Sequence, residues 1–174
     1  MSEKTPPTEF LNSVIQGLTE MAYNWEGSAY GIMGSLVGAS IVEDIALPQV
    51  KEGEKSRDVL VDEVSAILET ELTSRFGVAS NLKLARSEKQ GLTLEADNCV
   101  LIPSEDYMIN KGMQSRCLFC PVVNVVVESL YKVGIDSEIR SWEIGSKQNP
   151  HCHHVIGLME DVPAATEIRA GKAC

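Results

Sequence analysis

The spacing of apolar residues changes along this chain, and that change constrains the fold more than any other feature. Up to Gly77 the apolar residues recur every three or four positions, which is the period of an amphipathic helix. From Leu82 onward they first alternate with polar residues, which is the period of a half-buried strand. A length of 174 residues fits one domain. We therefore expect a single domain of the α/β (α+β) class, helical in its first half and mixed in its second.

Three helices are predicted in the first half. The first begins at Thr8, a good N-cap residue, and its apolar residues share one face: Leu11, Val14, Ile15, Leu18, Met21, Ala22 and Trp25. The second covers the apolar, small-residue segment 28–45. The third begins near Ser56 and ends at Phe76, because Gly77 follows at the expected C′ position.

The second predicted helix is unusual in carrying Gly31, Gly34 and Gly38 on one face. A glycine costs a helix interior about 1 kcal/mol relative to alanine, so the glycines need a reason. Close packing of another helix is the favoured reason, and room for an apolar ligand is the alternative. The alternative makes the three glycines, together with Trp142, candidate residues of a ligand pocket.

The second half is predicted to hold four strands and one helix. A hairpin runs from Leu82 to Ala96, with its turn at 87–91. The helix begins at Pro121, a residue typical of the first helical position, and ends at Gly134. Strands around 139–144 and 152–159 follow, separated by a turn at 145–150. Residues 1–7 are expected to be a flexible arm, residues 8–160 the domain, and residues 161–174 a loosely ordered tail.

The charge balance excludes several classes of partner. The chain has 25 acidic and 15 basic residues, a net charge of −10, so it offers no basic surface for nucleic acid or anionic lipid. No apolar run approaches the roughly 20 residues of a membrane span. The first residues, MSEKTPPTEF, contain no apolar segment of a signal peptide. We expect a cytoplasmic protein with neither a nucleic-acid nor a membrane partner.

Cysteine and histidine are concentrated in the second half. All three histidines lie at 151–154, and four of the five cysteines are Cys99, Cys117, Cys120 and Cys152. On an alternating strand Cys152 and His154 face one side, and His151 and His153 face the other. Cys117, Cys120, Cys152 and His154 would then suit tetrahedral zinc, with Cys99 as a possible replacement.

Three alternatives to zinc stay open at this point. The four cysteines at 99, 117, 120 and 152 could hold an iron–sulfur cluster. Cys117 and Cys120 form a C-x-x-C pair, which could act as a redox dithiol. The cysteines could also be buried thiols beside solvated histidines.

The stretch from Cys117 through Asn149-Pro150-His151-Cys152 to Val155-Ile156-Gly157 resembles the end of the 4-vinyl reductase domain family. It is especially similar to the sensor domains of aromatic-responsive transcriptional activators. The resemblance implies the fold of the vesicle-tethering transport-particle subunits, an antiparallel sheet of about four strands packed against helices. It also implies a homodimer, and a hydrophobic pocket for a small apolar or aromatic ligand beside a structural zinc.

The resemblance further implies a set of metal ligands. The helix-leading cysteine of the family corresponds to Cys117 or Cys120, and the cysteine of its last strand corresponds to Cys152. The family's glutamate corresponds to Glu143, but the cysteine position beside it holds Ile144 here. The second cysteine of the C-x-x-C pair, or His154, would then complete the set, with His151 as a further alternate. Glu143 could instead be the solvent-facing residue of its strand.

The predicted function is a stand-alone binding or sensor domain for a small hydrophobic or aromatic ligand, held together by zinc. The alternative is an iron–sulfur or dithiol redox protein. The chain has no P-loop, no glycine-rich cofactor loop and no evident general base, so no catalytic residue is assigned and an enzyme is the less favoured class.

Overall fold

The computed structural model describes residues 14, 16–18, 29–49, 55–87, 91–102, 110, 120–143, 145 and 148–159. Its helices are α2 (Ala29–Val42), α3 (Arg57–Thr70), the π-helical turn η1 (Glu71–Arg75) and α5 (Pro121–Lys132). Its strands are β1 (Asn81–Ser87), β2 (Gly91–Asp97), β3 (Ser137–Glu143) and β4 (His151–Leu158). The predicted α+β class is confirmed. The predicted arm 1–7 and tail 161–174 lie outside the described residues, as does most of the predicted helix 8–25.

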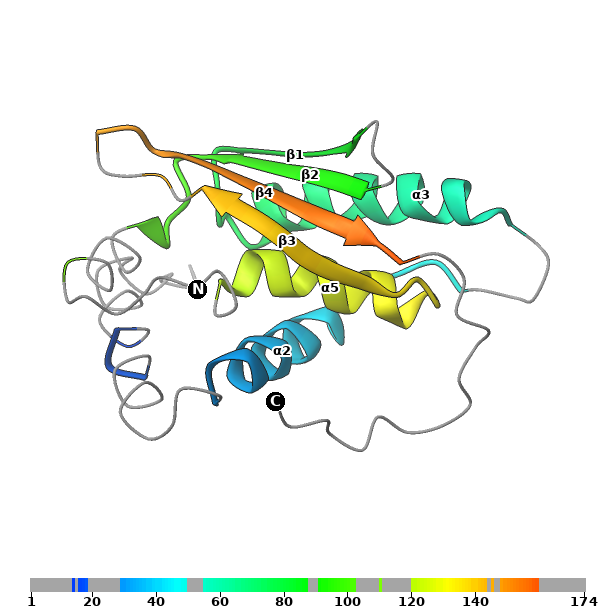
Figure 1. Cartoon of the computed structure of the whole chain (residues 1–174), viewed down its shortest axis with the longest axis horizontal. Coiled ribbons are helices and arrows are strands. Elements are labelled where there is room, and N and C mark those ends of the chain that lie inside the picture. The colour runs from blue at the N-terminus through cyan, green and yellow to red at the C-terminus, as the bar shows by residue number, and fades with distance from the viewer. Residues whose placement is uncertain are drawn as a thin grey trace, which may run out of the picture.

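The four strands form one antiparallel sheet in the order β1-β2-β4-β3 (Figure 1). The two central strands, β2 and β4, are far apart in the sequence, and their register runs from Gly91 opposite Gly157 to Asp97 opposite His151. The backbone N–H of Asn98 donates to the carbonyl oxygen of Pro150 at 2.7 Å and continues the pairing beyond β2. The hairpin prediction for β1 and β2 is confirmed.

The helices lie on one side of the sheet in two layers. Figure 1 shows α3 and α5 beneath the sheet, with α5 between the sheet and α2. The inner face of the sheet, the face toward these helices, contributes buried apolar side chains that include Leu92, Leu94 and Ile156. No helix in the described part of the chain combines the length and the apolar composition that crossing a membrane requires.

The local signals at the helix ends act as the sequence predicts. Ser56 is the N-cap of α3, and its Oγ accepts a hydrogen bond from the backbone N–H of Val59 at 3.4 Å. Pro121 occupies the first turn of α5. Gly77 and Gly134 both have positive φ angles, 61° and 81°, which glycine adopts without a Cβ penalty. The valine-rich segment 122–127 is helical because these end signals and its burial outweigh its strand propensity.

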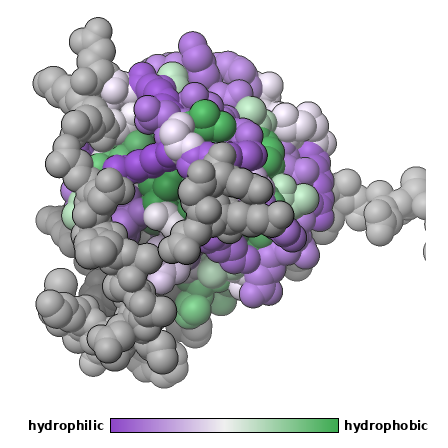
Figure 2. Space-filling view, turned by 90° about the vertical axis from the view of Figure 1, so that its right-hand side faces the viewer, coloured by the Kyte–Doolittle hydropathy of each residue, from purple (hydrophilic) through white to green (hydrophobic). Residues whose placement is uncertain are grey.

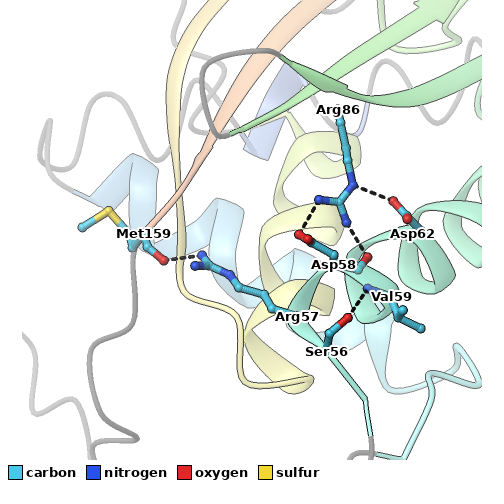
Figure 3. Close-up of polar contacts among 7 residues, drawn as sticks. All are labelled: Ser56, Arg57, Asp58, Val59, Asp62, Arg86 and Met159. Atoms are coloured by element: carbon cyan, nitrogen blue, oxygen red, sulfur yellow. Dashed lines mark hydrogen bonds and ion pairs between the residues drawn. The ribbon is translucent and has the colours of Figure 1, made fainter.

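A charged cluster fastens the start of α3 to the sheet (Figure 3). Arg86 lies on the helix-facing row of β1, and its guanidinium donates to the carboxylates of Asp62 at 2.7 Å and Asp58 at 2.5 Å. The hydrogen bond to Asp62 is the largest cause of a raised pKa of Arg86, and the hydrogen bond to Asp58 is the second largest. Arg57 also donates to the carbonyl oxygen of Met159, just after β4. The cluster sets the position of α3 under one end of the sheet.

The edge strand β1 is protected by the same helix. The backbone N–H of Leu84 donates to the Glu69 carboxylate at 2.7 Å, so α3 occupies a donor that an edge strand would otherwise expose. β3, the other edge, carries Glu138, Arg140 and Glu143 and has a bulge between Ile139 and Ser141. Charged residues and bulges both disfavour pairing with another strand.

The α2–α5 contact depends on one glycine. A Cβ added to Gly38 would lie 2.8 Å from the backbone carbon and 2.9 Å from the carbonyl oxygen of Asn124. Asn124 is buried, and its side-chain amide donates to the carbonyl oxygen of Cys120 at 3.0 Å, which fixes the start of α5. Close helix packing therefore explains Gly38.

Replacing Gly38 with alanine is expected to lower the free energy of unfolding by about 1–3 kcal/mol, because backbone atoms of α5 must move to accept the methyl group. Gly17→Ala is the matched control, since Gly17 is also helical and has nothing within 4 Å of its added Cβ. There alanine should be neutral or stabilising by up to about 1 kcal/mol. Urea denaturation measures both, and equal effects of the two substitutions would contradict the packing explanation.

Candidate functional site

Three buried cysteines gather at one end of the sheet. Cys99 follows the end of β2, Cys152 lies at the start of β4, and Cys120 precedes α5 as its N-cap residue. Their exposed fractions are 8%, 6% and 7%. Antiparallel β2 and β4 place the end of one beside the start of the other, which brings Cys99 and Cys152 to the same end of the sheet. Of the predicted ligands, Cys117 lies outside the described residues.

Cys152 has a structural role in the turn before β4. Its Sγ accepts a hydrogen bond from the backbone N–H of Gly145 at 3.4 Å. A Cβ on Gly145 would lie 2.7 Å from the carbonyl oxygen of His151 and 2.9 Å from that of Asn149, so only glycine fits this close turn. The thiol thus satisfies a buried backbone donor where the chain reverses between β3 and β4.

His154 is the most deeply buried ionisable side chain of the site. It lies on the inner face of β4, 2% exposed, between Leu94 on β2 and Trp142 on β3 in the strand register. Burial, and secondarily the charge of neighbouring His153, lower the pKa of His154 to about 4. Its imidazole is therefore uncharged at neutral pH. Trp142 beside it is 36% exposed.

The other two histidines lie on the outer face of the sheet, which confirms the predicted separation along β4. His151 Nδ1 is 2.8 Å from a carboxylate oxygen of Asp97, and this hydrogen bond, followed by the one from Asn81, lowers the pKa of Asp97. His153 Nδ1 lies 3.7 Å from the Glu95 carboxylate. These cross-strand pairs were not predicted, because local spacing does not show which strand pairs with β4.

Glu143 also belongs to the outer face. It is exposed and lies opposite His153 in the register of β3 and β4. Directly opposed residues of an antiparallel pair point to the same side, so Glu143 points away from Cys152 and His154. The structure therefore supports Glu143 as a solvent-facing residue of its strand rather than as a metal ligand.

The candidate pocket residues have different surroundings. Gly34 and Gly38 are buried in α2, and Gly38 contacts Asn124 directly. Gly31 lies within α2, in a stretch whose side-chain environment is not described. Trp142 lies on β3, directly opposite His154 of β4 in the strand register, and is partly accessible. Trp142 therefore stays a candidate pocket residue, whereas Gly38 has a packing role.

Comparisons with known proteins bear on the fold. Neither protein-family models nor curated proteins give a match to this sequence. Among solved structures, an Fe(II) unliganded H-NOX protein from K. algicida is similar, with a TM-score of 0.52 and 13% identity over 94% of this chain and 79% of that chain. A single-substitution mutant of the same protein gives a TM-score of 0.49 and 13% identity, over 93% and 78%. At this identity the similarity shows an α/β fold.

The predicted zinc cofactor is wrong, and so is the iron–sulfur cluster offered as its alternative. Among the described residues, no group of three or more His, Cys, Asp or Glu side chains is placed to hold a metal ion. Cys152 instead accepts the N–H of Gly145, His154 is buried between Leu94 and Trp142 in the strand register, and His151 and Glu143 lie on the opposite face.

The burial of His154 predicts acid-sensitive stability. The unfolded chain protonates this imidazole below about pH 6.5, whereas the folded chain does so only near pH 4. The unfolded state therefore binds more protons in this window, and the free energy of unfolding should fall on acidification from about pH 6.5 to 4, by up to about 3 kcal/mol.

Urea denaturation at several pH values measures this loss. His154→Leu should remove His154's share of the slope, because leucine has no proton to bind. His153→Gln is the matched control on the partly exposed outer face and should retain most of the slope. An unchanged slope in His154→Leu would contradict the assignment.

A domain without a structural zinc should be insensitive to chelators. EDTA should leave the melting temperature of the purified protein unchanged, because the described contacts of Cys152 need no metal. Cys152→Ala should lower the free energy of unfolding by about 1–3 kcal/mol, since the N–H of Gly145 loses its acceptor. The loss should be equal with and without EDTA. A chelator-dependent melting temperature in the native sequence would restore a structural metal.

Proposed function

We propose that this domain binds a small, uncharged hydrophobic or aromatic molecule at the inner face of the sheet, beside Trp142 and His154, and acts as a sensor for it. One observation carries the proposal. A buried, uncharged imidazole, that of His154, lies between Leu94 and the partly accessible Trp142 in the strand register. Small-molecule sites are typically apolar surfaces with a few polar groups that orient the ligand.

Two similarities support the same proposal. The segment from Cys117 to Gly157 resembles the 4-vinyl reductase domain family, whose members include sensors of aromatic compounds. The solved H-NOX structure, which has a similar fold, is described as an unliganded Fe(II) protein.

Electrostatics narrows the ligand class. With a pKa of about 4, His154 supplies no positive charge at neutral pH, but its ring nitrogens can still donate and accept hydrogen bonds. The chain as a whole carries a net charge of −10, which repels anions. A neutral aromatic molecule with one hydroxyl group therefore fits better than a carboxylate.

Trp142 provides a fluorescence test of the proposal. In a Trp25→Phe background, Trp142 is the only tryptophan, and its emission reports on its own surroundings. We expect saturable quenching by phenol, weaker quenching by toluene, which lacks the hydroxyl group, and little by benzoate. His154→Leu should reduce the preference for phenol over toluene by roughly tenfold, the equivalent of about 1.4 kcal/mol.

Phe76 supplies the matched control for the site. It has the same exposed fraction as Trp142, 36%, but lies after η1, away from the β3–β4 pair. Phe76→Ala should leave the Trp142 titration unchanged. Linear, non-saturable quenching by all three compounds would contradict a specific site and with it the proposed function.

A further inference from the structure

The outer face of the sheet carries polar and charged side chains at the end where β2 finishes and β4 begins. The described helices all lie beneath the opposite face, and Figure 2 shows hydrophilic side chains gathered over the top of the molecule, where the sheet lies in Figure 1. Asp97 of β2 and His151 of β4 are directly opposite each other in the strand register. Their side chains are 43% and 42% exposed, so a dissolved molecule can reach the pair.

Both carboxylate oxygens of Asp97 are held in place. Oδ1 lies 2.8 Å from Nδ1 of His151, and Oδ2 accepts a hydrogen bond from the side-chain amide of Asn81 at 3.1 Å. The backbone beside the pair is fixed as well, because the N–H of Asn98 donates to the carbonyl oxygen of Pro150 at 2.7 Å. The pair therefore sits on the two central strands, and such rigid elements hold a functional geometry better than loops do.

This contact determines which ring nitrogen of His151 carries the proton. A carboxylate only accepts hydrogen bonds, so Nδ1 is the donor and holds the proton. In the uncharged imidazole the lone pair is then on Nε2, the nitrogen that takes no part in the hydrogen bond to Asp97. A carboxylate in this position also stabilises positive charge that develops on the ring during a reaction.

His153 provides a comparison within the same strand. It lies two residues further along β4, on the same face, and its Nδ1 is 3.7 Å from the carboxylate of Glu95. That distance is beyond hydrogen-bond reach, so Glu95 does not fix the ring proton as Asp97 does. The two histidines thus share a strand, a face and a neighbouring carboxylate, and they differ in the hydrogen bond at Nδ1.

We propose that His151, positioned by Asp97, is a nucleophile that hydrolyses small activated esters at the outer face of the sheet. The Nε2 lone pair forms a bond to the ester carbonyl carbon, and the bond from that carbon to the leaving phenolate breaks. The product is an acyl-imidazolium, whose positive charge Asp97 stabilises through the Nδ1–H. Water then adds to the acyl carbon and gives one proton to the solvent. The carboxylic acid leaves, and the electron pair of the broken C–N bond returns to Nε2.

The surroundings narrow the class of ester. A nucleophile with one orienting carboxylate suits esters whose leaving group departs without a proton, as nitrophenolate does. The neighbouring row of the same face holds Lys83, Glu95, His153 and Glu143 in register. Its two carboxylates outnumber its one ammonium group, which disfavours an anionic acyl group. Small, neutral aryl esters are therefore the expected substrates.

Steady-state hydrolysis of p-nitrophenyl acetate by the full-length chain tests the role of His151. At about pH 8, where histidine is ordinarily uncharged, the native chain should exceed an equal concentration of N-acetylhistidine by at least about tenfold. His151→Gln should lower the rate by about tenfold or more. His153→Gln is the matched control and should retain most of the rate. The steady rate is compared because acylation of a thiol gives only an initial burst.

Asp97→Asn tests the positioning role separately. Asparagine can donate to Nδ1, which moves the ring proton to Nε2 and removes the lone pair from the reacting nitrogen. The rate should fall by about tenfold or more, while the melting temperature stays close to the native value because the position is exposed. Nitrogen-15 NMR should place the His151 proton on Nδ1 in the native chain and on Nε2 in the variant.

Three results would overturn the proposal. The first is a native rate no higher than that of N-acetylhistidine, and the second is an equal loss in His151→Gln and His153→Gln. The third is a native His151 whose ring proton is on Nε2, because the hydrogen bond to Asp97 would then not set the reacting nitrogen. The NMR result does not depend on activity, so it stands even if a variant is unstable.

Discussion

The pairing of β2 with β4 is the constraint on which the rest of this structure depends. It joins segments about 60 residues apart and fixes seven opposed pairs, from Gly91–Gly157 to Asp97–His151. Gly91 is necessary here, since a Cβ on it would lie 2.6 Å from the carbonyl oxygen of Ile156. A slip of one residue would exchange the two faces of the sheet and place His151 and His153 in the core.

This register sorts the chemistry of β4 onto two faces. Cys152, His154 and Ile156 face the helices and are buried, whereas His151 and His153 meet the carboxylates of β2 at the outer face. Histidines one residue apart therefore experience opposite environments. Burial makes His154 a weak base, while a carboxylate lies beside each of its neighbours. The ligand site that we propose and the acid sensitivity of the fold both arise from this sorting.

The fold was largely predictable from the sequence because its signals are local. Ser56, Pro121, Gly77 and Gly134 mark helix ends through their own backbone chemistry, and the alternation in 82–84 and 92–96 identifies the hairpin.

The site was less predictable because it depends on contacts between distant segments. The Arg86–Asp62 and His151–Asp97 pairs follow from tertiary register, which local spacing does not contain. The zinc prediction failed for a related reason. The cysteine and histidine side chains are of the types that bind zinc, but the Sγ of Cys152 accepts the N–H of Gly145 and His154 is buried between two strand neighbours, Leu94 and Trp142. The glycine pattern of α2 is compatible with close helix packing and with a ligand pocket. Only the position of the Asn124 backbone, which local spacing does not contain, selects packing for Gly38.

An NMR titration of the three imidazoles with phenol tests the proposed ligand site most directly. The ring-nitrogen resonances of His154 should shift saturably as phenol is added at neutral pH. Those of His151 and His153, on the outer face, should remain in place. Shifts confined to His151 and His153, or no shift at His154 at saturating phenol, would contradict a ligand site at the inner face of the sheet.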